Sequence, residues 1–259
     1  MAGAFEGKRG LVLGVANKRS IAWAIARRLA DGGASLAFTF QGERISSTVR
    51  ELAASIDSPL VTECDVRSDD DVARVFGEVG EAFGGELDLL VHSVAFAAAE
   101  DLEGRFTDTP RDRFWMAIDI SAYSLVAVTR AVAPLMDTRG GGSVLTLTYL
   151  GSQRVFPNYN VMGVAKAALE SSVRYLAAEL GPRNIRVNAV SAGPIKTLAA
   201  AGIGGFSGIL QVYRERAPLK RNTETSEVAD AARFLLGPGG RGITGEILTV
   251  DGGYSAMGL

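Results

Sequence analysis

The sequence predicts an α/β fold in which a doubly wound, mainly parallel sheet of seven strands forms one domain over residues 1–259. Short runs rich in apolar and β-branched residues alternate along the chain with longer segments of helical periodicity. Several of the short runs are almost continuously apolar, which is typical of strands covered by helices on both faces. No linker, repeat or low-complexity segment divides the chain, so we expect a single domain.

The expected strands lie, in chain order, at 10–14, 35–40, 60–64, 87–91, 143–148, 185–190 and 247–250. Helices are expected at about 20–31, 43–55, 68–83, 111–136, 159–180 and 226–236. Long crossover segments of this kind join parallel strands. The glycine cluster at 140–142 is too short for a domain linker and is expected to end one helix before the next strand.

Composition and charge narrow the classes of function. Hydrophobic residues make up 47% of the chain and charged residues 22%, as in an ordinary folded enzyme. The net charge is −2, and Lys and Arg are spread along the sequence, so we expect no nucleic-acid partner. No apolar run approaches the length of a membrane span, and residues 1–8 lack the features of an export signal. The single cysteine, Cys64, suits a small core residue of a cytoplasmic protein.

The first predicted strand leads through Gly14 into a helix that begins near Ser20. In open α/β sheets this turn is where a dinucleotide pyrophosphate meets backbone amides and the helix dipole. The spacing does not fit G-x-G-x-x-G, and a structural turn with Ser20 as the N-cap explains it about as well. Small residues at Ala22 and Ala26 favour the binding site, in which Ser20 caps the helix and contacts phosphate together with the amide of Ile21.

Tyr159 and Lys166 are seven residues apart, so in a helix both side chains would point from one face. Tyr149 lies ten residues before Tyr159, just past a predicted strand. Two phenols and an amine beside a nucleotide site suit stabilisation of negative charge on a substrate oxygen during hydride transfer. Taken alone, the spacing also fits an ordinary amphipathic surface, and Tyr149 also fits an aromatic residue that packs on the core.

Seven segments together carry a family resemblance across the chain. They lie at 14–26, 64–66, 91–97, 148–151, 157–163 with Lys166, 192–199 and 251–253. With this order and spacing, the chain resembles the short-chain dehydrogenase/reductase superfamily and, within it, the bacterial NADH-dependent enoyl-acyl-carrier-protein reductases. The resemblance implies a Rossmann-like domain. The usual superfamily pattern has three residues between Tyr and Lys and a richer glycine loop, and this chain departs from both as enoyl reductases do.

The resemblance also implies which residues bind the cofactor. Asp65 would accept a hydrogen bond from the adenine amine and Val66 would cover the ring, although an Asp after a strand is commonly a turn or cap residue. The other implied contacts are Gly14, Ser20, Ile21, Gln41, Ser93, Val94, Ala95, Lys166, Ile195 and Thr197.

The choice of cofactor depends on the residues after the second strand. Gln41 has no charge to attract a 2′-phosphate, so NADH is favoured. Arg44 suits a solvated helix surface but leaves NADPH open. The sole histidine, His92, is interpreted as structural, because no orienting carboxylate or nucleophile lies near it in the sequence. No metal is expected.

A segment at about 197–216 is expected to cover the substrate. It is rich in glycine, interleaved with apolar residues, which fits a lid that closes around a fatty chain better than an exposed loop. Enoyl reductases have a helix here, often with Lys or Arg for the acidic carrier protein. This chain has Gly204, Ser207 and Gly208 at the corresponding positions. The basic residues that could replace them are Arg214, Arg216, Lys220 and Arg221.

The resemblance implies hydride transfer from NADH to the β-carbon of a trans-2-enoyl thioester in fatty-acid elongation, with acyl carrier protein as partner and a homotetrameric assembly. Tyr159 would donate to the thioester oxygen. Lys166 would hold ribose hydroxyls and favour an ionised or strongly donating phenol. The implied substrate contacts are Tyr149, Phe96, Ala97, Met162, Ala199 and Phe206. Two alternatives remain, a ketone or 3-oxoacyl reductase of the same superfamily and a non-catalytic nucleotide-binding protein.

Overall fold

Seven strands form one sheet in the order β3-β2-β1-β4-β5-β6-β7, and every neighbouring pair is parallel. The structure is a computed structural model that describes residues 3–198, 200 and 204–258. The strands are β1 (Arg9–Leu13), β2 (Ser35–Phe40), β3 (Val61–Glu63), β4 (Leu89–His92), β5 (Gly142–Thr148), β6 (Ile185–Ala192) and β7 (Ile247–Val250). The strand order reverses between β1 and β4, which leaves a crevice at their carboxyl ends. The predicted doubly wound α/β fold is therefore confirmed.

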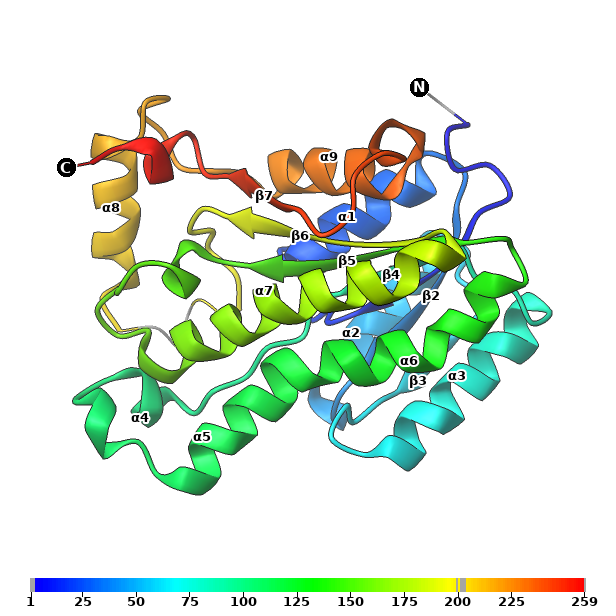
Figure 1. Ribbon diagram of the computed structural model, residues 1–259, viewed down its shortest axis with the longest axis horizontal. Helices are drawn as coiled ribbons and strands as arrows, with labels where there is room; N and C mark the ends of the chain where they lie inside the picture. Colours follow the sequence, from blue (N-terminus) through cyan, green and yellow to red (C-terminus); the bar gives the residue numbers. More distant parts are fainter. Residues whose placement is uncertain (1–2, 199, 201–203, 259) are drawn as a thin grey trace.

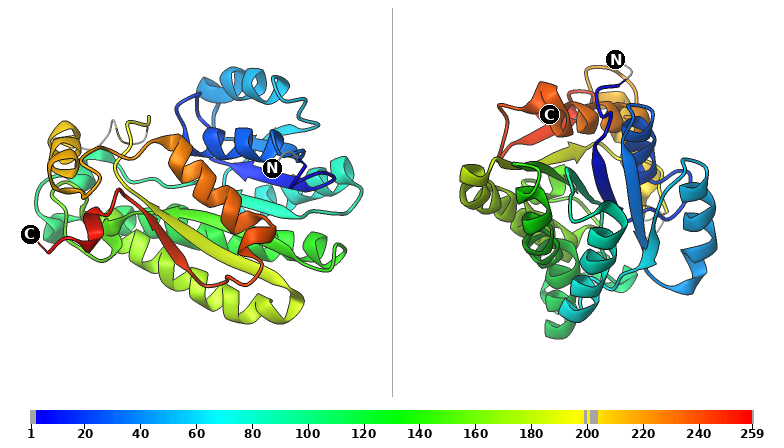
Figure 2. Two further views of the ribbon diagram at one scale, coloured as in Figure 1. Left: turned by 90° about the horizontal axis from the view of Figure 1, so that it is seen from above. Right: turned by 90° about the vertical axis from the view of Figure 1, so that its right-hand side faces the viewer.

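Helices cover both faces of this sheet (Figures 1 and 2). One hydrophobic cluster joins the sheet to α1 (Ile21–Ala30), α2 (Glu43–Ala54) and α9 (Thr225–Leu236). A second cluster joins the opposite face to α3 (Asp69–Phe83), α6 (Ser124–Asp137) and α7 (Asn160–Leu180). Burial of these two apolar layers is the main force that holds the domain together.

Three shorter helices lie toward the carboxyl edge of the sheet, at the left in Figure 1: α4 (Ala99–Leu102), α5 (Arg111–Ile118) and α8 (Phe206–Arg216). The helix expected at 111–136 is divided into α5 and α6 by a π-helical turn, Asp119–Tyr123. Ser121 in this turn accepts a hydrogen bond from the amide of Phe96 over 2.9 Å and donates to its carbonyl over 3.1 Å. The turn thereby anchors the loop after β4, a role that apolar periodicity does not reveal.

The helical run Arg111–Asp137 meets the length and hydropathy criteria for a membrane span, with a mean hydropathy of 1.4, contrary to the expectation that no run approached them. These criteria are also met by the core helices of proteins that do not span membranes. In the fold, 61% of the most apolar part of this run is buried, and Leu125, Val128 and Val132 belong to the core. The run is a core helix.

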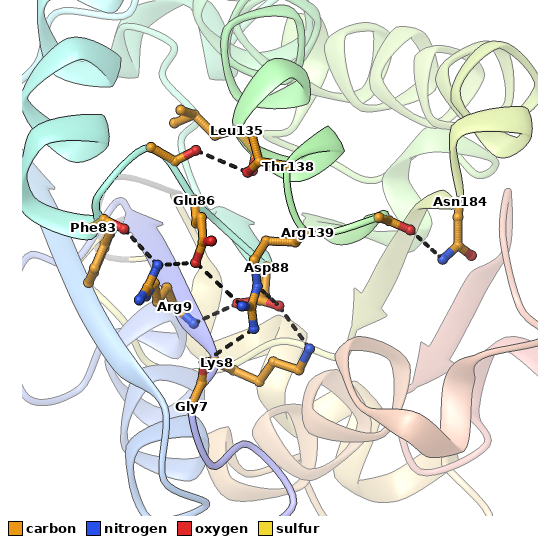
Figure 3. A network of polar contacts seen from close by, with 12 residues as sticks. Gly7, Lys8, Arg9, Phe83, Glu86, Asp88, Leu135, Thr138, Arg139 and Asn184 are labelled. Carbon is orange, nitrogen blue, oxygen red and sulfur yellow. Dashed lines mark hydrogen bonds and ion pairs between the residues drawn. The ribbon is translucent and has the colours of Figure 1, made fainter.

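A charged cluster fixes the amino ends of the central strands (Figure 3). The buried carboxylate of Asp88, just before β4, accepts hydrogen bonds from Lys8 Nζ over 2.8 Å, the Arg9 amide over 3.0 Å and Arg139 Nε over 3.2 Å. Burial alone would raise the pKa of Asp88, but these donors outweigh it and lower the pKa below its usual value. This structural cluster lies at the end of the sheet opposite to the crevice.

Candidate active site

A cavity of about 170 Å³ lies at the carboxyl ends of β1 and β4. It brings together most of the residues predicted to bind a cofactor. Those in its lining are Gly14, Ser20, Ile21, Ser93, Val94, Ala95, Lys166 and Thr197. Ala16, Leu147 and Leu198 complete the lining, and none of these side chains is acidic. A cavity with a cation and no carboxylate suits an anionic ligand.

Gly14 is required by the way β1 approaches β4. Leu13 pairs with His92 in the sheet, so the next residues, Gly14 and Ser93, lie against each other. Gly14 has φ +93°, and a Cβ atom there would lie 2.0 Å from the carbonyl oxygen of Ser93. Only glycine permits this approach, which brings the first turn of α1 and the end of β4 to one cavity.

Ser20 lies at the N-cap position of α1, but its hydroxyl does not cap the helix, so that expectation is wrong. The loop before α1 curls back, and the Ser20 hydroxyl accepts hydrogen bonds from the amides of Ala16 and Asn17 over 3.1 and 3.0 Å. The first-turn amides of a helix have no acceptor within the helix itself. Because Ser20 and Ile21 line the cavity, this end of α1 suits binding of a phosphate.

Lys166 is buried on α7, with 7% of its surface exposed, and its Nζ donates to the carbonyl of Leu147 over 2.8 Å. Burial lowers the pKa of Lys166 to about 8, and the nearby Glu170 acts in the opposite direction. Glu170 lies one turn later on α7 and accepts hydrogen bonds from Thr148 and Ser152 over 2.7 and 2.5 Å. Sequence reasoning missed Glu170, although its i,i+4 spacing from Lys166 was a usable signal.

Tyr159 directly precedes α7 and packs edge-on against Tyr149, with ring centroids 5.1 Å apart. The ring is buried in a small cluster with Met162 and Ala165. Burial raises the pKa of Tyr159 above its usual value, and the proximity of Tyr149 and Glu170 raises it further. Of the two forms expected, an ionised or a strongly donating phenol, this environment favours the protonated, donating one.

Tyr149 is held by Tyr213, which sequence reasoning missed. The hydroxyl of Tyr213 donates to that of Tyr149 over 3.2 Å, and its ring stacks on Tyr254 at 3.7 Å. Burial raises the pKa of Tyr149 to about 12, partly offset by this hydrogen bond. Tyr213 is on the buried face of α8, and its spacing from Ile209 and Phe206 was the available signal.

Only some of the other predicted substrate residues lie near Tyr149 and Tyr159. Ala97 and Met162 pack in the cluster of Tyr159. Phe96 is 47% exposed, and Phe206 is the half-buried first residue of α8. Ala199 lies outside the described residues. The structure thus brings Ala97 and Met162, but not Phe96, into contact with the buried phenols.

At the predicted adenine end, the structure changes two expectations. The carboxylate of Asp65 is bound by Arg67, through Nε at 3.0 Å and Nη2 at 2.5 Å, so an adenine amine would compete with Arg67. These hydrogen bonds lower the pKa of Asp65. Val66 is 6% exposed and packs in the core, so its side chain does not offer the expected cover for an adenine ring. Gln41 is exposed after β2.

The nicotinamide-side loop follows β6. Thr197 lines the cavity, and its amide donates to the carbonyl of Ile195 over 2.8 Å. Ile195 packs against the core, so Thr197 is the residue of this pair that lines the cavity.

His92 and Cys64 have the structural roles expected of them. The ring nitrogens of His92 lie 2.9 Å from the Thr146 hydroxyl and 2.8 Å from the Ser124 hydroxyl. Burial lowers the pKa of His92 to about 3, with a further contribution from Lys166, so the ring is neutral. Burial raises the pKa of Cys64 to about 12, which keeps its thiol protonated and unreactive.

The same set of residues falls within a family match. The sequence model of the family described as Enoyl-(Acyl carrier protein) reductase matches residues 14–255, which include the cavity, the tyrosines and α8. The chain belongs to this family. The match narrows the resemblance from the superfamily to the enoyl reductases. It includes both the Tyr-x6-Lys pair and the segment after β6.

Relatives and solved structures of the family agree over nearly the whole chain. The enoyl-[acyl-carrier-protein] reductase [NADH] FabI of Bacillus subtilis (strain 168) is 52% identical over 251 residues, which are 96% of each chain. Enoyl-[acyl-carrier-protein] reductase [NADH] 1 of Rhizobium meliloti (strain 1021) is 49% identical, over 99% of this chain and 93% of the relative. The crystal structure of the Bacillus cereus reductase with NADP+ and indole naphthyridinone has a TM-score of 0.96 and 51% identity, over 100% of both chains. The Aquifex aeolicus VF5 enzyme has a TM-score of 0.95 and 46% identity, over 99% of this chain and 100% of that one.

Proposed function

We propose that the protein is an NADH-dependent enoyl-[acyl-carrier-protein] reductase, which reduces the carbon–carbon double bond of a trans-2-enoyl thioester in fatty-acid elongation. The observation that carries this proposal is the buried, neutral phenol of Tyr159, held edge-on against Tyr149 at the entry to the helix that bears Lys166. The relatives named as NADH-dependent enoyl reductases support the reaction and its cofactor.

The cavity residues fit a nicotinamide dinucleotide. Gly14, Ser20 and Ile21 would hold the pyrophosphate, because the glycine admits close backbone approach and the start of α1 favours an anion. Lys166 would hold ribose hydroxyls and Thr197 the carboxamide. When bound, NADH supplies the hydride. Gln41 favours NADH over NADPH because it brings no positive charge to a 2′-phosphate.

The residues of the chain stabilise the charge that develops on the substrate. Reduction at the β-carbon moves electron density to the thioester oxygen, and Tyr159 is the donor for that oxygen. The raised pKa of Tyr159 keeps its proton in place as a hydrogen bond. Tyr149, held by Tyr213, positions the thioester. Lys166 has a pKa of about 8 and is mostly a cation at neutral pH, so it can bind hydroxyl groups and pass on the proton that the reduced thioester takes up at its α-carbon, which water then replaces.

The decisive experiment compares two substrates with both cofactors. We expect NADH to be oxidised with a crotonyl thioester, more slowly with an acetoacetyl thioester, and more slowly when NADPH replaces NADH. Faster turnover of the acetoacetyl thioester would favour the ketone-reductase alternative. Binding of NADH without oxidation by either thioester would favour a non-catalytic protein. NADPH is included because the Bacillus cereus structure contains NADP+.

We further propose acyl carrier protein as the partner and a cytoplasmic homotetramer as the assembly. Tyr175 and Val164 on α7 are exposed, at 78% and 38%, which suits contact with another copy of the chain. Light scattering tests the assembly, since a mass of one subunit would contradict it, and cell fractionation tests the compartment.

A further inference from the structure

A groove of about 530 Å³ lies between three segments that are far apart in the sequence. They are the loop at 150–158 after β5, helix α8, and the C-terminal segment at 254–258, which lies beside α8 in Figure 1. The walls are largely apolar and include Phe156, Ile209, Val212 and Met257. This volume is within the range of small-molecule binding sites.

Two guanidinium groups, those of Arg154 and Arg216, are also in the lining, and no carboxylate is among the lining residues that the structure describes. Among the described residues, neither arginine takes part in an ion pair, whereas Arg183 and Arg221 each bind a carboxylate. Arginines without a carboxylate partner that share one groove favour an anionic ligand, above all a phosphate.

The helix α8 leaves space on its side of the groove. Gly204, Gly205 and Gly208 line it without side chains, and a Cβ atom at Gly208 would meet nothing within 4 Å. Asn158 donates to the Gly204 carbonyl over 2.9 Å, which joins the start of this segment to the loop at 150–158. The carboxylate of Glu103 lies beside Gly204 but is not part of the groove lining.

The groove shares a wall with the active site. Tyr213 and Tyr254 line the groove, and the hydroxyl of Tyr213 donates to the hydroxyl of Tyr149. A ligand in the groove therefore lies one side chain away from the residue assigned to position the thioester. A long, flexible substrate that reaches Tyr149 could extend into this groove.

We propose that the groove binds the phosphopantetheine arm of the substrate, with Arg154 and Arg216 at its phosphate. The proposal rests on the function proposed above, because only a thioester substrate brings such an arm. The arm combines amides and methyl groups with one phosphate, which matches apolar walls with two cations. Acyl carrier protein and coenzyme A both present this chemistry.

The test compares crotonyl pantetheine with crotonyl 4′-phosphopantetheine, which differ only in the phosphate. We expect the unmodified protein to show a KM about tenfold lower for the phosphorylated thioester, as one charged hydrogen-bonded contact gives. In Arg154→Gln and Arg216→Gln this KM ratio falls toward one, while Arg154→Lys keeps part of it. Arg27→Gln is the control, since Arg27 is exposed on α1 outside the groove lining, and it keeps the full ratio.

The outcomes separate this inference from the proposed function. Reduction of both thioesters with equal KM in the unmodified protein overturns the phosphate site and leaves the reductase intact. Reduction of neither overturns the proposed function itself. Crotonyl coenzyme A and the crotonyl carrier protein are then compared in the arginine variants. Equal loss with both supports a contact to the arm, and loss with the carrier protein alone overturns it in favour of a contact to the carrier surface.

Discussion

The hydroxyl of Tyr213 on α8 donates a hydrogen bond over 3.2 Å to the hydroxyl of Tyr149, which directly follows β5. The two tyrosines are 64 residues apart in the sequence. Tyr213 is almost fully buried, with 1% of its surface exposed, and its ring also stacks on Tyr254. The position of α8, within the segment expected to cover the substrate, is thereby coupled to the aromatic residue beside Tyr159.

Replacement Tyr213→Phe removes this donor but keeps the ring. We expect kcat/KM for an enoyl thioester to fall about fivefold and the free energy of unfolding to fall by about 1 kcal/mol, as for one lost buried hydrogen bond. Steady-state kinetics and urea unfolding measure the two effects. Tyr123→Phe, which removes an exposed hydrogen bond with Arg130, is the control, and equal behaviour of the two variants would contradict the coupling.

Replacement Tyr159→Phe removes the proposed donor to the thioester oxygen. We expect kcat to fall by about 10²- to 10⁴-fold, the usual contribution of a positioned proton donor. The KM for NADH should stay within about twofold, because the phenol is assigned to the substrate. Initial-rate kinetics with NADH and a crotonyl thioester decide the matter, and an unchanged kcat would remove Tyr159 from the mechanism.

The charge on Lys166 predicts a pH dependence. With a pKa of about 8, this side chain loses its positive charge as pH rises through that value, so we expect NADH binding to weaken over the same range. Fluorescence titrations of NADH between about pH 6.5 and 9.5 measure the effect. The variant Lys166→Ala should bind NADH more weakly and without this step, and the same step in both would assign it to another group.

Lys166 affects stability in the opposite direction: NADH binding is expected to weaken as pH rises, whereas the free energy of unfolding is expected to increase. The pKa of Lys166 is lower in the folded protein than its ordinary value, so the unfolded chain binds more protons between about pH 8 and 10.4. The contribution of this residue to the free energy of unfolding therefore rises with pH across that window. Urea unfolding across the window should show a smaller rise with pH for Lys166→Ala than for the unmodified protein.

Replacement Asp88→Asn tests the charged cluster at the amino ends of the strands. We expect the free energy of unfolding at pH 7 to fall by about 2 kcal/mol, because three donors lose a charged acceptor that is itself buried. The pKa of Asp88 is lowered on folding, so its contribution is present above the unfolded value of about 4 and is lost as pH falls through the folded value. The difference between the two proteins should shrink in acid. Asp137→Asn, in an exposed pair with Arg183, serves as the control and should change little.

The pattern of apolar runs predicted the seven strands and the long helices, because the central strands are buried on both faces and the long helices each have a buried face. The resemblance to the enoyl reductases implied most of the cavity residues, and these meet because the carboxyl ends of neighbouring parallel strands lie at one edge of the sheet. The pattern could not reveal contacts made across the fold. Tyr213 reaches Tyr149 from a separate helix. The Arg67–Asp65 pair is local, but it depends on the turn after β3, which apolar periodicity does not describe. Ser20 failed as a cap because the preceding loop, not the helix, supplies its donors.

The cofactor cavity and the arginine-lined groove are built from different loops and share no lining residue among those described. The close approach of Gly14 to the Ser93 carbonyl leaves almost no freedom for substitution at Gly14, whereas residues 154–157 and the C-terminal segment lie at the surface or half-buried. Substitutions in the groove can therefore change which thioesters the protein accepts while the turn at Gly14 keeps its shape, and the Tyr149–Tyr213 hydrogen bond links the groove to the phenol beside Tyr159.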